Sequence, residues 1–352
     1  MTEIDLCIIC DTTGSMASAI QCVQTTLKQV VSDLAAEGHD LMVAAVQYKD
    51  YGDQPEVGAV AFSSDVAATK GAIDSWQATG GNDHPEAMSL GLHAATELAW
   101  RSDSTKLVVL CADAPPHGIG SSGDSFPNGC KKGIDPIAMT VQLRKRGVAL
   151  YTVGVNNPDD LTVAFLSTIS KISGGRYLPL SDAAALSVVL VGGAKEEAQL
   201  NHFSEDMERE RDVVETEAKN NGRVLSEEEV FAEVARRLQA KGVNVAQPTN
   251  SALLGGGHAW ESAVEDMAQA QTLSTYGALQ TKNKAAFVAK PRCADSASSR
   301  AFAYGRSPRD TEAEESESSM HAPAHAAELS YCAMPVAAEQ VSRFFSRSKP
   351  TA

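Results

Sequence analysis

Buried strands that alternate with amphipathic helices constrain this fold more than any other feature of the sequence. Residues 4–10 form a nearly continuous apolar run, which is typical of a strand buried on both faces. Residues 106–112 form a second such run. Over residues 17–36 and 84–100, apolar residues instead recur at three- and four-residue steps, which indicates helices. The alternation predicts an α/β fold, namely a doubly wound, mostly parallel sheet of about six strands flanked by helices.

Composition argues against two classes of protein. The 352 residues include 30 Lys and Arg against 45 Asp and Glu, a net charge of −15. We therefore expect no nucleic-acid partner, because so acidic a chain would repel phosphates. No apolar run is long enough to span a membrane. Four of the seven cysteines lie in apolar runs and no signal peptide precedes the first strand, so we predict a reduced, cytoplasmic protein.

Three segments of different composition follow one another along the chain. Residues 1–194 carry the α/β pattern. Residues 195–290 are charge-dense and predict a helical extension, in which Ser-x-x-Glu at residues 226–229 has the spacing of a helix-capping box. Residues 291–352 are rich in Ala, Ser, Glu and Pro, which predicts a low-complexity, disordered tail. Within that tail, residues 336–345 have the pattern of a short docking helix.

Side chains with oxygen atoms follow two of the predicted strands. Asp11, Thr13 and Ser15 come at alternate positions after the first strand, and Asp113 ends a later one. Ligands of open α/β sheets bind at this carboxyl edge. If the two strands are neighbours, their carboxylates repel each other unless they are protonated or bridged by a cation. Hard oxygen donors favour Mg²⁺, Mn²⁺ or Ca²⁺, so we predict one divalent cation here.

The same residue types have simpler explanations. Asp, Thr and Ser cap the first backbone N–H groups of helices, and Asp113 precedes two prolines as turn residues do. A third loop, before the helix over residues 84–100, adds Thr79, Asn82 and Asp83 as further oxygen donors.

Three separated motifs resemble the von Willebrand factor type A domain. They are Asp-Thr-Thr-Gly-Ser-Met from residue 11, Ala-Thr-Gly-Gly-Asn-Asp-His-Pro-Glu from residue 78, and Ala-Asp-Ala-Pro-Pro-His-Gly from residue 112. The resemblance covers residues 1–194 and extends to the branch found beside alpha-kinases and in hemicentin. It implies a metal-ion-dependent adhesion site in which Asp11, Thr13 and Ser15 contact or orient the metal. Asp113 would then lie just behind these groups or reach the metal through water.

One departure from the family pattern concerns the third loop. Many members have Gly-Gly-Thr where this chain has Gly-Gly-Asn, ending at Asn82. Asp83 is our preferred substitute for the missing hydroxyl because it supplies an anionic oxygen, and Thr79 and the carbonyl of Asn82 are weaker candidates. In this family an acidic side chain of a protein partner completes the metal's open position.

The resemblance therefore implies a non-enzymatic module that binds a protein partner through a divalent cation. The regulatory part of an alpha-kinase, or a relative of one, is an alternative function, although residues 195–352 contain no recognisable catalytic region. A degenerate domain that binds no metal is a second alternative.

Other motifs are discounted. Cys7 and Cys10 have the spacing of a zinc or redox pair, but positions three apart on a strand face opposite sides, so we predict core cysteines. Ser125 follows no strand and lacks a nucleophile elbow, which argues against a catalytic serine. His117 is interpreted as a polar residue at the rim of the metal site rather than an acid or base.

Overall fold

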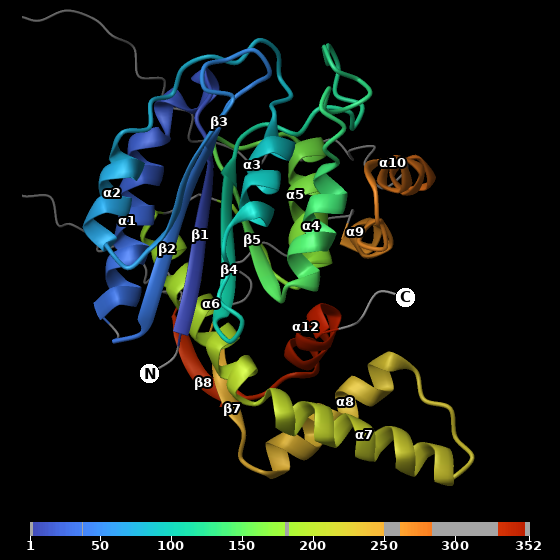
Figure 1. The fold of residues 1–352 in the computed structure, drawn as a ribbon. Coiled ribbons are helices and arrows are strands. Elements are labelled where there is room, and N and C mark those ends of the chain that lie inside the picture. Colours follow the sequence, from blue (N-terminus) through green and yellow to red (C-terminus); the bar gives the residue numbers. More distant parts are fainter. Residues whose placement is uncertain (1–2, 37, 180–182, 250–260, 284–329, 349–352) are drawn as a thin grey trace, which may run out of the picture.

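The central sheet lies between two layers of helices. The computed structural model describes residues 3–36, 38–179, 183–249, 261–283 and 330–348 (Figure 1). The carboxyl ends of the parallel strands lie at one edge of the sheet, and helices cover both of its faces. None of the helices in this described part of the chain combines the length and the apolarity that a bilayer crossing requires.

The sheet has the strand order β3-β2-β1-β4-β5-β6, and only β3 runs antiparallel to its neighbour. The strands are β1 (Glu3–Asp11), β2 (Asp40–Tyr48), β3 (Val57–Ser63), β4 (Thr105–Ala112), β5 (Val148–Gly154) and β6 (Tyr177–Pro179). This arrangement confirms the predicted doubly wound, mostly parallel sheet. The chain switches direction across the sheet at β1, which pairs with both β2 and β4, and such switch points open a crevice at the carboxyl edge.

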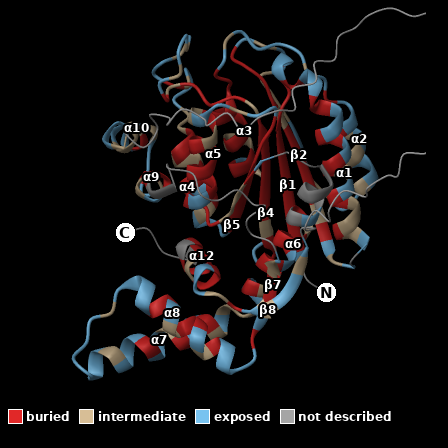
Figure 2. Ribbon diagram, turned by 180° about the vertical axis from the view of Figure 1, so that it is seen from behind, coloured by how far each residue is buried: buried red, intermediate tan, exposed pale blue. Residues whose placement is uncertain are grey.

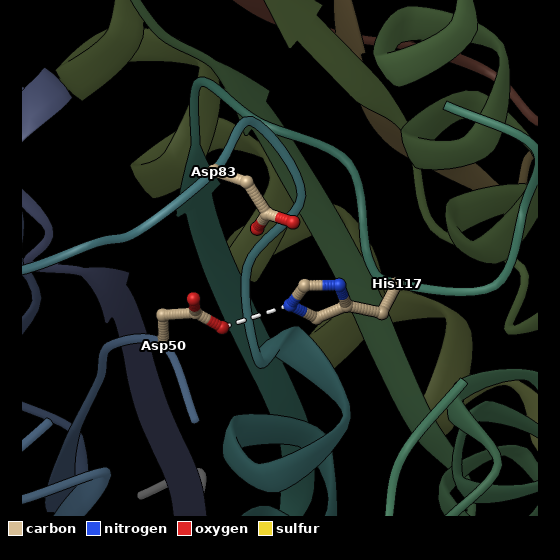
Figure 3. A group of neighbouring side chains, drawn as sticks. All are labelled: Asp50, Asp83 and His117. Atoms are coloured by element: carbon tan, nitrogen blue, oxygen red, sulfur yellow. Dashed lines mark hydrogen bonds and ion pairs between the residues drawn. The ribbon is translucent and has the colours of Figure 1, made fainter. Parts of the chain in front are cut away.

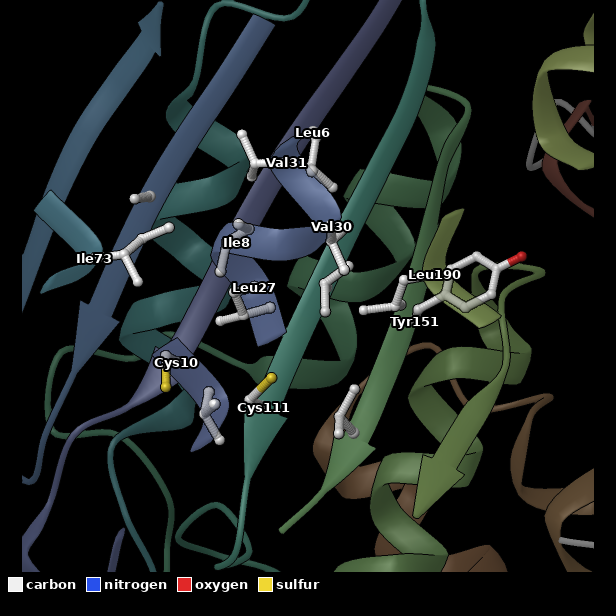
Figure 4. Close-up of a cluster of buried hydrophobic side chains, with 14 of the residues drawn as sticks. Leu6, Ile8, Cys10, Leu27, Val30, Val31, Ile73, Cys111, Tyr151 and Leu190 are labelled. Atoms are coloured by element: carbon white, nitrogen blue, oxygen red, sulfur yellow. The ribbon is translucent and has the colours of Figure 1, made fainter. Parts of the chain in front are cut away.

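Each face of the sheet has its own apolar core. One face carries the 3₁₀ helix η1 (Gly14–Ser18) and the helices α1 (Ile20–Ala36), α2 (Val66–Asp74) and α6 (Ala183–His202). The other carries α3 (Met88–Glu97), α4 (Pro136–Lys145) and α5 (Asp160–Ile172), with α9 (Glu261–Met267) and α10 (Leu273–Lys282) packed outside them. Figure 4 shows Leu6, Ile8 and Cys10 of β1 facing the first layer, whereas Cys7 belongs to the second core. The interpretation of the two cysteines as core residues is confirmed.

The C-terminal region continues directly from the sheet domain. α6 runs through the predicted boundary between residues 194 and 195, so this boundary falls inside a helix rather than in a linker. The helices α7 (Ser204–Asn220) and α8 (Glu227–Ala240) follow, and β7 (Asn244–Pro248) pairs antiparallel with β8 (Tyr331–Pro335), which leads into α12 (Ala338–Ser348). In Figures 1 and 2, α7 and α8 lie beyond the amino edge of the sheet, away from the crevice, and their outer faces are exposed.

The prediction of disorder over residues 291–352 is wrong for β8 and α12. Val341, Phe344 and Phe345 are buried in a third core formed with α7, α8 and β7. The average composition of the tail obscures these few apolar side chains. They become ordered by packing on α7, α8 and β7 of the same chain. The docking helix predicted over residues 336–345 corresponds to α12. The rest of the predicted tail lies outside the described residues.

Buried ion pairs fasten α12 to α6. Arg343 donates to Glu196 at 2.9 Å and also contacts Glu197, which in turn pairs with Arg347. Gln340 donates to the same Glu196 oxygen at 2.8 Å. All five side chains belong to residues that are less than a tenth exposed. Charges taken this far out of water are tolerated only because each finds a partner of opposite sign.

The predicted capping box begins α8. Ser226 Oγ accepts a hydrogen bond from the backbone N–H of Glu229, and the Glu229 carboxylate accepts one from the backbone N–H of Ser226. We expect Ser226→Ala to lower the free energy of unfolding by about 1 kcal/mol, the usual cost of losing such a cap. Urea unfolding followed by circular dichroism would measure this loss. The exposed Glu228 of the same turn, replaced by Gln, is the control, and an equal loss in both variants would contradict the assignment.

Candidate metal centre

The carboxyl ends of β1 and β4 bring two acids together. The strands are parallel neighbours, with Cys10 opposite Cys111, so Asp11 and Asp113 leave the sheet at the same edge. The backbone N–H of Thr12 still donates to Tyr48 O at the end of β2. The chain therefore turns away from the sheet only after Asp11 has been fixed at its edge.

A continuous series of polar contacts connects the four residues that follow these strands. Asp11 Oδ1 accepts hydrogen bonds from the N–H of Thr13 at 2.8 Å and from its hydroxyl at 2.7 Å. Thr13 Oγ1 lies 3.2 Å from Ser15 Oγ, and the Ser15 hydroxyl donates to Asp113 Oδ1 at 3.0 Å. The structure thus brings Asp11, Thr13, Ser15 and Asp113 into one group. That this group binds a metal stays a prediction.

Asp11 is the most deeply buried acid of the group. Its residue is fully buried, and Oδ2 has no hydrogen-bond partner among the residues that the structure describes. Burial raises the pKa of Asp11 to about 7 and the charge of Asp113 adds to this, against the two hydrogen bonds from Thr13 and the nearby hydroxyl of Tyr48, which is also buried without a partner among the described residues. An unpartnered carboxylate oxygen in such a place is costly unless a proton or a cation satisfies it.

Two members of this neighbourhood were missed by sequence reasoning. Asn156 Nδ2 donates to Asp113 Oδ2 at 3.1 Å and to the backbone carbonyl of Ser15 at 3.0 Å, which holds the two loops together. Because Asn156 lies just beyond β5, the rule about carboxyl ends of strands could have found it. The second is Glu86, the last residue of the motif that begins at residue 78, for which the sequence predicted no role.

Glu86 is 3% exposed, and its Oε2 atom lacks a hydrogen-bond partner within the described part of the chain. Burial raises the pKa of Glu86 to about 10, and the charges of Asp11 and Asp50 add to the effect. Two neighbouring carboxyl groups, Asp11 and Glu86, therefore share an environment that disfavours their negative charge.

The predicted candidates of the third loop have other hydrogen-bond partners. The Thr79 hydroxyl accepts a hydrogen bond from Lys49 Nζ at 3.1 Å, and Asn82 Nδ2 donates to Asp50 Oδ2 at 3.4 Å. Asp83 Oδ2 accepts from the N–H of Ser125 at 2.6 Å. Among the described residues, none of these three side chains is hydrogen-bonded to Asp11 or Asp113. Their role as substitutes for the missing hydroxyl stays a prediction.

Asp83 instead faces a second group of side chains, which Figure 3 shows together with Asp50 and His117. One ligand atom from each of these three residues lies within 4.8 Å of the others. His117 Nε2 is 2.8 Å from Asp50 Oδ1, and its Nδ1 is 2.7 Å from Asp124 Oδ1. The imidazole is thus held between two carboxylates.

The interpretation of His117 as a rim residue is wrong, because its side chain is 1% exposed. Burial alone would lower the pKa of His117, but its hydrogen bonds to Asp50 and Asp124 outweigh burial and raise it. A protonated imidazole donates to both carboxylates at once. This cationic bridge ties the loop after β2 to the loop after β4.

Comparisons with known proteins agree with this architecture. A family model described as the von Willebrand factor type A domain matches residues 5–190. An ariadne-like RING finger protein of Acanthamoeba polyphaga mimivirus is 29% identical over 183 residues, which are 50% of this chain and 18% of that protein. Alpha-protein kinase vwkA of Dictyostelium discoideum is 29% identical over 136 residues, or 37% of this chain and 22% of the kinase. The chain therefore spans less than a quarter of either relative.

Solved structures match this chain at lower similarity. A von Willebrand factor type A structure from Catenulispora acidiphila has a TM-score of 0.39 and 17% identity, and the match covers 56% of this chain and 43% of that one. The pilus adhesin SpaC from Lactobacillus rhamnosus GG has a TM-score of 0.42 and 14% identity, with 56% and 31% covered. Since the family model matches more than half of the residues, the chain belongs to the von Willebrand factor type A domain family.

Proposed function

We propose that this chain is a non-enzymatic module that binds a protein partner through one divalent cation, Mg²⁺ or else Mn²⁺ or Ca²⁺, at the carboxyl edge of its sheet. Type A domains are generally non-catalytic protein-interaction modules. The observation that carries the metal dependence is the unpartnered, fully buried Oδ2 of Asp11 beside the hydroxyls of Thr13 and Ser15.

The chemistry of these groups fits a hard cation. The hydroxyl protons of Thr13 and Ser15 are donated to Asp11 and Asp113, so the lone pairs of the two hydroxyl oxygens are left to meet at 3.2 Å. Adjacent oxygens around Mg²⁺ are about 3 Å apart, since each lies roughly 2.1 Å from the ion in octahedral geometry. A cation would satisfy both hydroxyl oxygens and the free carboxylate oxygen together.

The exposed rim of the site suits a partner. Ser15 and Gly14 are exposed although Asp11 and Thr13 are buried, and Gly80–Asn82 are exposed across from them. Gly14 N–H donates to Gly80 O at 2.9 Å, which keeps the two exposed loops adjacent. An acidic side chain of a partner could therefore reach the cation from solvent, which is the recognition that we propose.

Calorimetric titration of Mg²⁺ and Mn²⁺ tests this function. We expect one cation per chain for the native protein and no measurable binding for Asp11→Ala, because that variant loses the buried carboxylate. The exposed acid Asp103, at the opposite end of β4, supplies the matched control Asp103→Ala, which should bind as the native chain does. No isotherm with the native chain, or one unchanged by Asp11→Ala, would favour the degenerate domain without metal.

A second candidate rests on the similarity to alpha-protein kinase vwkA. The chain would then be the regulatory part of an alpha-kinase, or a relative of one, rather than an independent module. A phosphotransfer assay with ATP on the purified chain separates the two: activity that disappears when residues 195–352 are deleted would support the kinase. The six described cysteines are free thiols, which supports an intracellular setting for either candidate.

A further inference from the structure

We infer that Glu86, and not Asp83, is the third carboxylate that holds the cation beside Asp11 and Asp113. The inference rests on the proposed function and names a residue of the same site. It starts from the buried side chain of Glu86, whose Oε2 atom has no partner among the described residues. Thr13 of the metal group is a neighbour of the same carboxylate.

The backbone of Glu86 is fixed between two loops of the site. Its N–H donates to Pro115 O at 2.9 Å, just beyond β4, and it forms a parallel bridge with Pro116. The next residue, Ala87, donates its N–H to Lys49 O at 3.1 Å, just beyond β2. Glu86 therefore emerges at a defined place between the strands that flank β1.

The side chain of Glu86 extends from there toward Thr13. A methyl group built on Gly81 would lie 2.9 Å from Glu86 Oε1 and 3.3 Å from Thr13 Cβ. The bare Cα of Gly81 thus leaves the room in which the carboxylate and Thr13 approach each other. Gly81 also has a φ of +84°, a backbone conformation that other residues rarely adopt, so this opening depends on glycine at this position.

A cation explains what the protein groups leave unsatisfied. Asp11 Oδ2 and Glu86 Oε2 are both buried without a partner in the described structure. The nearby ammonium of Lys49 is engaged with the carbonyls of Thr12, Gln77 and Thr79. Three carboxylates around one cation also bind it more tightly than two, because affinity at oxygen sites rises with the number of charged ligands.

The competing interpretation is that Glu86 is a neutral, protonated acid with a purely structural role. Glu86→Gln imitates that neutral form with almost the same shape. A structural Glu86 therefore predicts unchanged cation binding in this variant, whereas a metal-holding Glu86 predicts a loss. Asp83→Asn tests the sequence-based preference in the same loop, and Glu97→Gln, an exposed acid at the end of α3, is the matched control.

The experiment is calorimetric titration of the full-length chain and its variants with Mn²⁺ and Mg²⁺, together with thermal unfolding in EDTA. We expect Glu86→Gln to weaken cation binding at least about tenfold, as loss of a group close to a metal does. Asp83→Asn and Glu97→Gln should stay within about twofold of the native chain by the same reasoning. In EDTA, Glu86→Gln should unfold at the native temperature or above it, which separates lost binding from lost folding.

The outcomes separate the two levels of the argument. Native affinity in Glu86→Gln, or a loss confined to Asp83→Asn, overturns the role of Glu86 while leaving the proposed cation in place. Absence of binding by the native chain overturns the proposed function itself. If Glu86→Gln does not fold, Glu86→Asp keeps the charge but withdraws the oxygens, and native affinity in that variant would overturn the inference.

Discussion

Replacing Arg343 with leucine is expected to lower the free energy of unfolding by about 3–5 kcal/mol, the usual cost of removing one partner from a buried ion pair. Arg343 contacts Glu196 and Glu197 of α6 and donates to Gly174 O at 3.0 Å. Its loss leaves two buried glutamates with less compensation. The effect should be large because leucine cannot supply any of these hydrogen bonds.

Urea unfolding at pH 7 measures this loss as a change in midpoint at constant slope. Arg209 gives the matched control, since its ion pair with Asp206 joins residues one turn apart with side chains 61% and 40% exposed. Arg209→Leu should cost less than about 1 kcal/mol, as exposed pairs do. If the two variants lost equal stability, the network between α12 and α6 would not be the anchor described above.

Asp11→Asn is expected to make the cation-free protein more stable at pH 8. The pKa of Asp11 rises on folding from 3.8 to about 7, so the native state holds the proton more tightly than the unfolded chain does. The contribution of Asp11 to the free energy of unfolding therefore falls as the pH rises from about 4 to about 7. At 1.36 kcal/mol for each pKa unit, the ionised carboxylate costs the native state about 4 kcal/mol above that range.

Unfolding in EDTA at pH 4 and at pH 8 measures this effect. The asparagine variant should match the native chain at pH 4 and exceed it at pH 8, since an amide has no charge to bury and its Oδ1 can still accept the Thr13 hydrogen bonds. Added Mg²⁺ should stabilise only the native chain, by mass action. A native chain that gained stability from pH 4 to pH 8, relative to the variant, would show that Asp11 is ionised without cost.

The sheet could be predicted because the sequences of its central strands are almost continuously apolar. β1 and β4 are apolar along nearly their whole length, and only a strand covered on both faces tolerates that pattern. The positions of Asp11 and Asp113 followed, because residues at the carboxyl ends of neighbouring parallel strands have little freedom of placement.

The third loop could not be predicted in the same way, because its path depends on backbone conformation and on contacts far along the chain. Gly80 and Gly81 both adopt positive φ, and Gly81 N–H donates to Asp53 Oδ2 at 2.9 Å. These turns carry Asp83 toward His117, whereas Glu86, three residues later, is buried. Nearness in sequence could not show that Asp83 faces Asp50 and His117.

The burial of His117 was equally invisible in the sequence. Its two partners, Asp50 and Asp124, are separated from it by 67 and by 7 residues. The imidazole is enclosed by Tyr51 and Phe126, whose rings lie 5.1 Å and 4.9 Å from it between centroids. Only the folded loops bring these groups together.

β8 pairs with β7, and ion pairs hold α12 against α6. Contacts therefore hold the last described segment in place, whatever the path of the backbone that leads to it. If the backbone were cut between residues 283 and 330, we expect the two fragments to stay associated. The β7–β8 pairing, the apolar face of α12 and its ion pairs with α6 would hold them together. New chain ends or a guest domain introduced between residues 283 and 330 should therefore leave both of these parts folded and associated.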